Sequence, residues 1–206
     1  MSYIEFDDVK KIYKMGDVKI KALNGASFTI DKGEFAVIAG ASGAGKSTIF
    51  KLLLGLYKPQ KGSILINDMN SAAIPDNRKR KIFGYVEQSF HMVPGTVKEQ
   101  ITLYDDAITM EQVIKAAKLT GLHDTIMNLE HGYDTICTPE LFSQGQWQLL
   151  SIARAAAAEP KLLLLDEITA NLDADTERAV LQALKRVSED RTVISISDRG
   201  MAGTGG

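Results

Sequence analysis

The sequence has very little cysteine and no long apolar run. Its 206 residues include one cysteine, Cys137, so no disulfide can form within the chain. A bilayer span needs about 20 consecutive apolar residues, whereas the longest purely apolar runs here are only a few residues, such as Leu162–Leu165. The opening residues MSYIE lack the basic and apolar segments of a signal peptide. We therefore predict a chain of the reducing cytoplasm that does not itself cross a membrane.

An excess of charge of either sign is also absent. The chain has 24 Lys and Arg against 26 Asp and Glu, a formal net charge of -2. No overall positive field draws it to nucleic acid or to anionic lipid, so any membrane role must act through a partner. With 45% hydrophobic residues, the chain is long enough for one globular domain that carries an inserted lobe.

One local block of basic residues, Arg78–Lys81, interrupts this even mixture. Such a block can be a nuclear-targeting or nucleic-acid-binding patch. Here it leads directly into the apolar residues 82–86, as a junction between a helix and a strand would. We therefore interpret the block as a solvated helix face.

The first 30 residues alternate between apolar and polar positions, which predicts an antiparallel edge sheet. The apolar positions are Tyr3, Ile4, Phe6, Val18, Ile20, Ala22, Phe28 and Ile30. After a turn at residues 31–33, the continuous apolar run Phe35–Ala39 is typical of a strand buried on both faces. A helix is expected after residue 48, with its end at Gly55.

The middle of the chain has a helical pattern instead. Residues 109–119 have helical periodicity and Gly121 is a plausible helix end, so we predict a mainly helical insertion over residues 89–155. Strands at 161–166 and 192–197 and a helix through 180–187 then resume the α/β pattern. The prediction is a single domain, 1–206, with an α/β core (1–88 and 156–206) of the P-loop NTPase, RecA-like class.

A complete phosphate-binding motif lies between the predicted strand and helix of the core. It matches G-x-x-x-x-G-K-[ST] at Gly40, Ala41, Ser42, Gly43, Ala44, Gly45, Lys46, Ser47 and Thr48. Its glycines let successive backbone N–H groups and a helix N-terminus point at phosphates. Lys46 would contact the β- and γ-phosphate oxygens, and Ser47 would offer its hydroxyl to Mg²⁺.

An acidic pair, Asp166–Glu167, follows the apolar strand at 162–165. In a parallel sheet this strand end lies near the bound phosphates, which favours a catalytic role. Taken alone, the pair could equally be an N-cap and a first-turn acid of a following helix.

The short element Phe142–Gln146, Phe-Ser-Gln-Gly-Gln, lies between these two motifs. The order of a phosphate loop, a Ser-x-Gly-Gln element and an apolar strand ending in Asp-Glu resembles the ATP-binding cassette (ABC) ATPases over nearly the whole chain. This resemblance implies that Asp166 holds Mg²⁺ through its water shell and that Glu167 is the general base for water. It also implies that Gln88 touches Mg²⁺ and the attacking water, and that Tyr13 stacks on adenine. The alternative for Tyr13 is an ordinary strand aromatic. A lone glutamine has no specificity, so the role of Gln88 rests on its place in the order of motifs.

The signature element departs from the commonest family form, LSGGQ, at Phe142 and Gln144. Ser143, Gly145 and Gln146 keep the groups that, by resemblance, contact the ATP held by a second cassette. Gln144 can project outward if its backbone angles suit a residue with Cβ. Alone, the pentapeptide is a helix start. By resemblance it predicts a head-to-tail dimer.

Two later elements complete the family order. Residues 171–173, Asn-Leu-Asp, resemble the D-loop at the dimer seam, although Asp173 could be a helix N-cap. Asp198 stands where the family places a histidine that holds the γ-phosphate. A carboxylate there has the wrong sign for phosphate, which predicts weakened hydrolysis. Family members usually add another strand or two after this point, so the glycine-rich residues 200–206 suggest a clipped end.

The leading hypothesis is an ATPase cassette of an exporter that dimerises around two Mg-ATP at the cytoplasmic face of a membrane, with transmembrane subunits or domains as partners. The second hypothesis is a regulatory ATP-binding module, impaired in hydrolysis by Asp198. A third, a soluble ABC protein acting on ribosomes or DNA, is disfavoured by the single short acidic chain. We expect no nucleic-acid partner.

Overall fold

The computed structural model describes residues 1–41 and 43–197. Two compact units divide the described chain, one built from residues 1–79 and 192–197 and the other from residues 80–191. Helix α2, Asp76–Ile82, passes from the first unit into the second.

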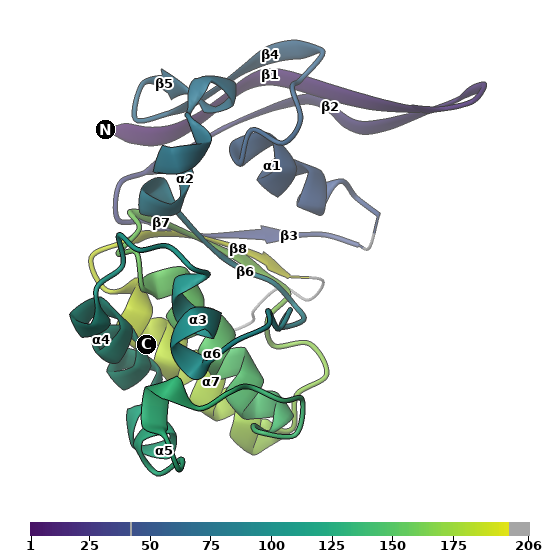
Figure 1. The fold of residues 1–206 in the computed structure, drawn as a ribbon. Coiled ribbons are helices and arrows are strands. Elements are labelled where there is room, and N and C mark those ends of the chain that lie inside the picture. Colours follow the sequence, from purple (N-terminus) through teal and green to yellow (C-terminus); the bar gives the residue numbers. More distant parts are fainter. Residues whose placement is uncertain (42, 198–206) are drawn as a thin grey trace. The chain divides into compact units, whose positions relative to one another are not determined.

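The first unit contains an antiparallel sheet. Its strands are β1 (Ser2–Met15), β2 (Val18–Asp31), β4 (Lys61–Ile66) and β5 (Met69–Asn70), in the order β2-β1-β4-β5. Strands β1 and β2 run side by side over their whole length and are joined by a two-residue turn (Figure 1). Ile4 and Phe6 are buried while Glu5 between them is exposed, because successive side chains point to opposite faces. The predicted antiparallel edge sheet is confirmed.

The same unit holds a parallel pair of strands and the helix that follows the first of them. β3 (Phe35–Ala39) pairs in parallel with β8 (Thr192–Ser197), and α1 (Lys46–Leu53) follows β3 after a short loop. The apolar side of α1, with Phe50, Leu52 and Leu53, is buried. A short 3₁₀ turn, Ser71–Ala73, lies against the end of α1, where the Ser71 hydroxyl donates to the Leu52 carbonyl at 3.1 Å. The helix stops before Gly55, as predicted.

The prediction that β3 is buried on both faces is wrong. Phe35 and Val37 are 48% and 41% exposed, whereas the alternating Ala36 and Ile38 are partly covered. An apolar strand can be buried on both faces, but burial also requires other elements to pack against each face. Ala36 and Ile38 are partly buried, and Phe35 and Val37 on the other face stay exposed.

The second unit combines two parallel strands with five helices. Strand β6 (Phe83–Val86) pairs with β7 (Leu162–Asp166), whose four leucines are buried. The helices are α3 (Val97–Thr102), α4 (Met110–Thr120), α5 (His123–Met127), α6 (Gln144–Ala156) and α7 (Ala174–Ser188). A 3₁₀ turn, Gly132–Asp134, follows α5. Helix α6 packs against α3, α4 and α7 (Figure 1).

Local capping signals set the ends of these helices. Thr96, Thr109 and Ser143 each begin a helix with a reciprocal capping box, in which the side chain accepts from the N3 amide and the N3 side chain accepts in return. Gly121 ends α4, so the helix predicted over 109–119 is confirmed. A core of Val97, Ile101, Val113, Leu122, Ile126, Tyr133, Phe142 and Leu150 joins them.

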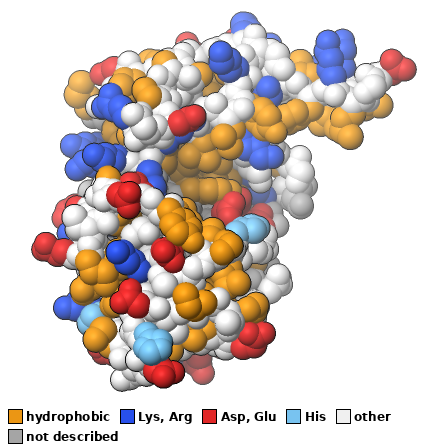
Figure 2. Space-filling model, viewed as in Figure 1, with side chains coloured by type: hydrophobic (Ala, Val, Ile, Leu, Met, Phe, Trp, Pro, Cys, Tyr) orange, Lys and Arg blue, Asp and Glu red, His pale blue; other side chains and the backbone are white. Residues whose placement is uncertain are grey.

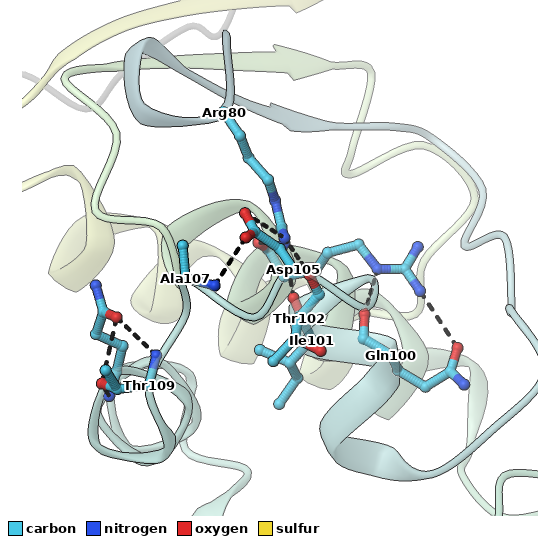
Figure 3. Close-up of polar contacts among 9 residues, drawn as sticks. Arg80, Gln100, Ile101, Thr102, Asp105, Ala107 and Thr109 are labelled. Atoms are coloured by element: carbon cyan, nitrogen blue, oxygen red, sulfur yellow. Dashed lines mark hydrogen bonds and ion pairs between the residues drawn. The ribbon is translucent and has the colours of Figure 1, made fainter. Parts of the chain in front are cut away.

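Arg80 corrects the interpretation of the basic block as a solvated helix face. Arg78 and Lys81 are exposed, but the Arg80 side chain is only 25% exposed and turns inward. Its guanidinium donates to the carbonyls of Ile101 (2.7 Å) and Thr102 at the end of α3 and lies 3.8 Å from Asp105 (Figure 3). The last carbonyls of a helix lack partners within the helix, so a buried guanidinium beside them is stabilising.

Two surface properties complete the fold. Acidic and basic side chains are interspersed on the face in view, and hydrophobic ones continue along the β1–β2 hairpin, where Met15, Val18 and Ile20 are exposed (Figure 2). Over the residues that the structure describes, no helix combines the length and the apolar character that a membrane crossing requires.

Candidate functional site

The phosphate-binding motif folds as a loop between β3 and α1. Gly43 and Gly45 have φ of 82° and 83°, in the left-handed region that glycine adopts at little cost. A Cβ on Gly45 would lie 2.2 Å from the carbonyl oxygen of Ala22 on β2, so no other residue fits there. Gly45 also begins α1 without a side-chain cap, which leaves the first N–H groups of the helix available to an anion. Ser42 lies outside the described residues.

The side chains at the start of α1 divide between the loop and the core. The Lys46 ammonium folds back over the loop and donates to the carbonyls of Gly40 and Ala41, at 3.2 Å for the latter. Lys46 and Thr48 are buried, both 7% exposed, while Ser47 is exposed. The loop therefore holds a positive charge, an exposed hydroxyl and helix N–H groups together, as a polyphosphate requires.

Tyr13, from β1, lies against the same helix. Its hydroxyl is 3.3 Å from Thr48 Oγ1, and its ring meets that of Tyr57 edge-on with centroids 5.8 Å apart. The Lys11 ammonium lies 5.5 Å from the Tyr13 ring and 5.1 Å from the Tyr57 ring. The structure thus brings the predicted adenine-stacking residue to the phosphate loop. Sequence reasoning missed Tyr57, which lies beyond the helix and follows no motif.

The acidic pair and Gln88 follow two neighbouring strands. Val86 of β6 and Leu165 of β7 are in register, so Gln88 and Asp166 come shortly after the same edge of this parallel pair. Asp166 ends β7, and Glu167 follows in the left-handed region with φ of 50°. The next helix begins only at Ala174, so the alternative of an N-cap and a first-turn acid is wrong.

Tyr85 is a residue of this edge that sequence reasoning missed. Its hydroxyl donates to Asp166 Oδ2 at 2.9 Å from the adjacent strand. Burial and, secondarily, the Asp166 charge raise the pKa of Tyr85 above its ordinary value, so the phenol keeps the proton that it donates. This bond orients the Asp166 carboxylate through its Oδ2 atom. No sequence signal marks Tyr85, because the pairing of β6 with β7 joins residues far apart in the chain.

The signature element begins α6. The Ser143 hydroxyl accepts from the Gln146 N–H at 3.2 Å, and the Gln146 side chain accepts from the Ser143 N–H at 2.9 Å. The helix-start interpretation is therefore confirmed. Gln144 is exposed and its backbone is not left-handed, so its side chain projects outward. A Cβ on Gly145 would lie 2.6 Å from Thr176 Cγ2 of α7, which explains the glycine through packing.

Phe142 replaces the usual leucine without loss of burial. It is 5% exposed in the helical core and meets Trp147 edge-on with centroids 5.1 Å apart. The core of the second unit thus accommodates phenylalanine at position 142 in place of the usual leucine.

Asp173 is the N-cap of α7. It accepts from the N–H groups of Asp175 (3.1 Å) and Thr176 (3.0 Å) and from the Thr176 hydroxyl (2.6 Å), and these bonds lower its pKa. The N-cap alternative is therefore what the structure contains, and nothing in it tests the D-loop role. Asp198 and residues 199–206 lie outside the described residues.

The side chains present fit a magnesium nucleotide. Mg²⁺ prefers oxygen ligands, usually one or two from the protein together with phosphate oxygens. Within its own unit, each of the Ser47 hydroxyl and the Asp166 carboxylate offers oxygen ligands of this kind. The described residues contain no cluster of three or more His, Cys, Asp or Glu that could hold a metal ion.

A family model for the ABC transporter family matches residues 23–170. The chain belongs to the ABC transporter family. This membership confirms the resemblance drawn from the signature element and also the α/β P-loop class of the fold.

Known proteins resemble this ABC cassette over almost its whole length. It is 39% identical over 199 residues to the leukotoxin translocation ATP-binding protein LktB of Mannheimia haemolytica, covering 96% of the cassette and 28% of that protein. The protein of the same name from Bibersteinia trehalosi is 39% identical over 198 residues, with 95% and 28% covered. A bacterial Atm1-family ABC exporter solved with ATP bound superimposes with a TM-score of 0.82 at 35% identity, covering 95% of the cassette and 34% of that chain. The cassette therefore spans only about a quarter to a third of these relatives.

Proposed function

We propose that the chain is the ATP-binding and ATP-hydrolysing cassette of an exporter, which dimerises head-to-tail around two Mg-ATP and transmits this closure to transmembrane partners. The observation that carries the proposal is the phosphate loop, where Gly45 admits no side chain and the Lys46 ammonium lies over the loop. Family membership and similarity to an exporter solved with ATP bound support the choice of ATP.

The proposed roles follow the chemistry of each group. The loop N–H groups and Lys46 bind the phosphates, and the Tyr13 ring stacks on adenine. Ser47, Asp166 and Gln88 hold Mg²⁺, which neutralises charge on the phosphates when bound. Glu167 accepts the proton of the attacking water. In the dimer, Ser143, Gly145 and Gln146 contact the nucleotide of the partner cassette.

The proposed setting is the cytoplasmic face of a membrane, to which the cassette is held by transmembrane subunits or domains. The two kinds of relative support export, since one is a translocation protein and the other is an exporter. The near-balanced charge of the sequence gives no independent reason for membrane binding. Attachment through a protein partner is the simpler arrangement.

Sedimentation of the wild-type chain with ATP, with ADP and without nucleotide tests the proposal. Mg-ATP should shift the chain from monomer to dimer, because only the γ-phosphate is shared between the loop of one copy and the signature of the other. ADP should leave the monomer. A chain that stays monomeric with bound ATP at high protein concentration would contradict the head-to-tail arrangement.

A second candidate function, an ATP-binding module with impaired hydrolysis, is favoured by Asp198 at the switch-histidine position. On this view the wild type binds ATP and dimerises but turns over slowly. Asp198→His should then raise the ATPase rate by about 10-fold or more, since removing one misplaced charge near a developing charge is worth at least about 1.4 kcal/mol. Steady-state phosphate release from both proteins at saturating ATP decides between them. Brisk and equal turnover would remove this candidate.

A further inference from the structure

The segment between β6 and α3, residues 87–95, has no regular secondary structure, and side chains from elsewhere hold it. The Gln100 side chain donates to the Val93 carbonyl at 2.7 Å and accepts from the Val93 N–H at 2.9 Å. The Arg154 guanidinium donates to the His91 carbonyl at 2.9 Å, and the Tyr104 hydroxyl donates to the Pro94 carbonyl. These side chains supply the partners that a ladder or a helix would otherwise give to the backbone groups of the segment.

Phe90 makes the aromatic contacts that hold residues 87–95 against α6. Its ring stacks on Trp147 with centroids 4.9 Å apart and an interplanar angle of 26°. The Arg154 guanidinium lies 4.1 Å from the centroid of the same ring. Trp147 and Arg154 are seven residues apart on α6, so they lie on one side of that helix, two turns apart. Together they form a clasp around Phe90.

Arg154 also ties the clasp to α3. Its Nε donates to the Gln100 carbonyl at 2.5 Å, and its NH2 group lies 3.3 Å from Gln100 Oε1 (Figure 3). Burial lowers the pKa of Arg154 to about 10, which keeps the side chain charged at neutral pH. A cation over an aromatic face contributes more when it is desolvated than when it is exposed.

We propose that Phe90, held between Trp147 and Arg154, is a positioning residue that makes the segment after Gln88 and the signature helix α6 move as one body. The inference rests on the proposed function, in which Gln88 senses the chain's own nucleotide and Ser143 the partner's. Phe90 lies two residues after Gln88, and Trp147 lies four after Ser143 at the start of α6. The Phe90 ring therefore connects the segment after Gln88 to the start of α6, which carries Ser143.

Three variants separate this positioning role from ordinary packing. Phe90→Leu keeps an apolar side chain but removes the ring faces. Phe90→Tyr keeps both faces. Arg80→Lys is the matched control, because Arg80 is a similarly buried arginine that bonds the end of α3 and the Arg154 carbonyl (3.3 Å). Its hydrogen bonds are to carbonyls of α3 and of the last turn of α6, not to residues 88–95.

Sedimentation with Mg-ATP gives the functional readout. Phe90→Leu should weaken ATP-dependent dimerisation by about 10-fold or more while the monomer's affinity for ATP stays within about 2-fold, because the phosphate loop and Tyr13 are untouched. Phe90→Tyr should restore wild-type dimerisation. Arg80→Lys should lower Tm but leave dimerisation near wild type. Equal weakening by Phe90→Leu and Arg80→Lys, or none by Phe90→Leu, would overturn the proposal.

Amide hydrogen exchange of the nucleotide-free chain tests the clasp even if the proposed function fails. Phe90→Leu should speed exchange both in residues 88–95 and in the first turn of α6. Arg80→Lys should speed it at the end of α3 and near Arg154 in the last turn of α6, but not in the first turn of α6 or in residues 88–95. Unchanged exchange at the start of α6 in Phe90→Leu would show that the segment and the helix are not coupled. A wild type that neither binds ATP nor dimerises would count against the proposed function alone.

Discussion

Replacing Lys46 by alanine is expected to reduce ATP affinity by about 10- to 150-fold and to abolish ATP-dependent dimerisation at concentrations that saturate the wild type. The ammonium of Lys46 lies over the loop on carbonyl oxygens, from which a phosphate would draw it. A hydrogen bond to a charged group contributes about 1.5–3 kcal/mol, and each 1.4 kcal/mol is a factor of 10 in affinity. Titration calorimetry with Mg-ATP measures the change directly.

Lys51→Ala is the matched control for this change. Lys51 lies on the same helix and is exposed, and its ammonium contacts the Tyr57 ring at 5.6 Å. Loss of this lysine should change ATP affinity by less than about 5-fold, since an exposed cation–π contact contributes about 0.5–1 kcal/mol. Circular dichroism confirms that both variants are folded. Unchanged ATP affinity and dimerisation in Lys46→Ala would refute the phosphate-binding role.

The second large effect is expected from Glu167→Gln. The amide cannot accept the proton of the attacking water, so the ATPase rate should fall by about 10²- to 10⁴-fold, the range of general-base catalysis. ATP binding should remain, so the ATP-bound dimer should accumulate. The phosphate-release rate and sedimentation with Mg-ATP measure the two effects. If the wild type turns over slowly, the Asp198→His background provides the reference rate.

Glu159→Gln provides the control, because Glu159 is also a glutamate with a left-handed backbone, φ 53° against 50° for Glu167. Its carboxylate is partly exposed and pairs with Lys115 at 2.5 Å. Exposed ion pairs contribute little to stability, so this variant should hydrolyse ATP at the wild-type rate. Equal rates for Glu167→Gln and Glu159→Gln would contradict the assignment of the base.

The sequence predicted features that depend on neighbouring residues. Capping boxes join positions three apart, so Thr109 and Ser143 were recognisable as helix starts. The glycine at position 45 followed from its motif, and the structure adds the carbonyl of Ala22 as the physical reason. These signals place the phosphate loop and the signature helix, which hold most of the candidate site.

Contacts between residues far apart in the chain produce no regular spacing in the sequence, so they could not be predicted from it. Tyr85 donates to a carboxylate 81 residues away, and Arg80 bonds a carbonyl 74 residues away. The local sequence around a tyrosine in a strand, or an arginine in a basic block, is the same whether the side chain faces solvent or bonds another part of the chain. The exposure of β3 was missed for a similar reason, because a strand's own sequence does not state how many layers cover it.

Trp147 gives the chain an intrinsic spectroscopic reporter. It is the one tryptophan in the 206-residue sequence, its ring stacks on Phe90, and its indole N–H donates to the Pro139 carbonyl at 3.2 Å. All tryptophan emission therefore comes from a single indole at the first turn of the signature helix. A displacement of that helix from the segment after Gln88 would alter the polarity around this indole, and its emission maximum would record the motion in real time without any attached dye.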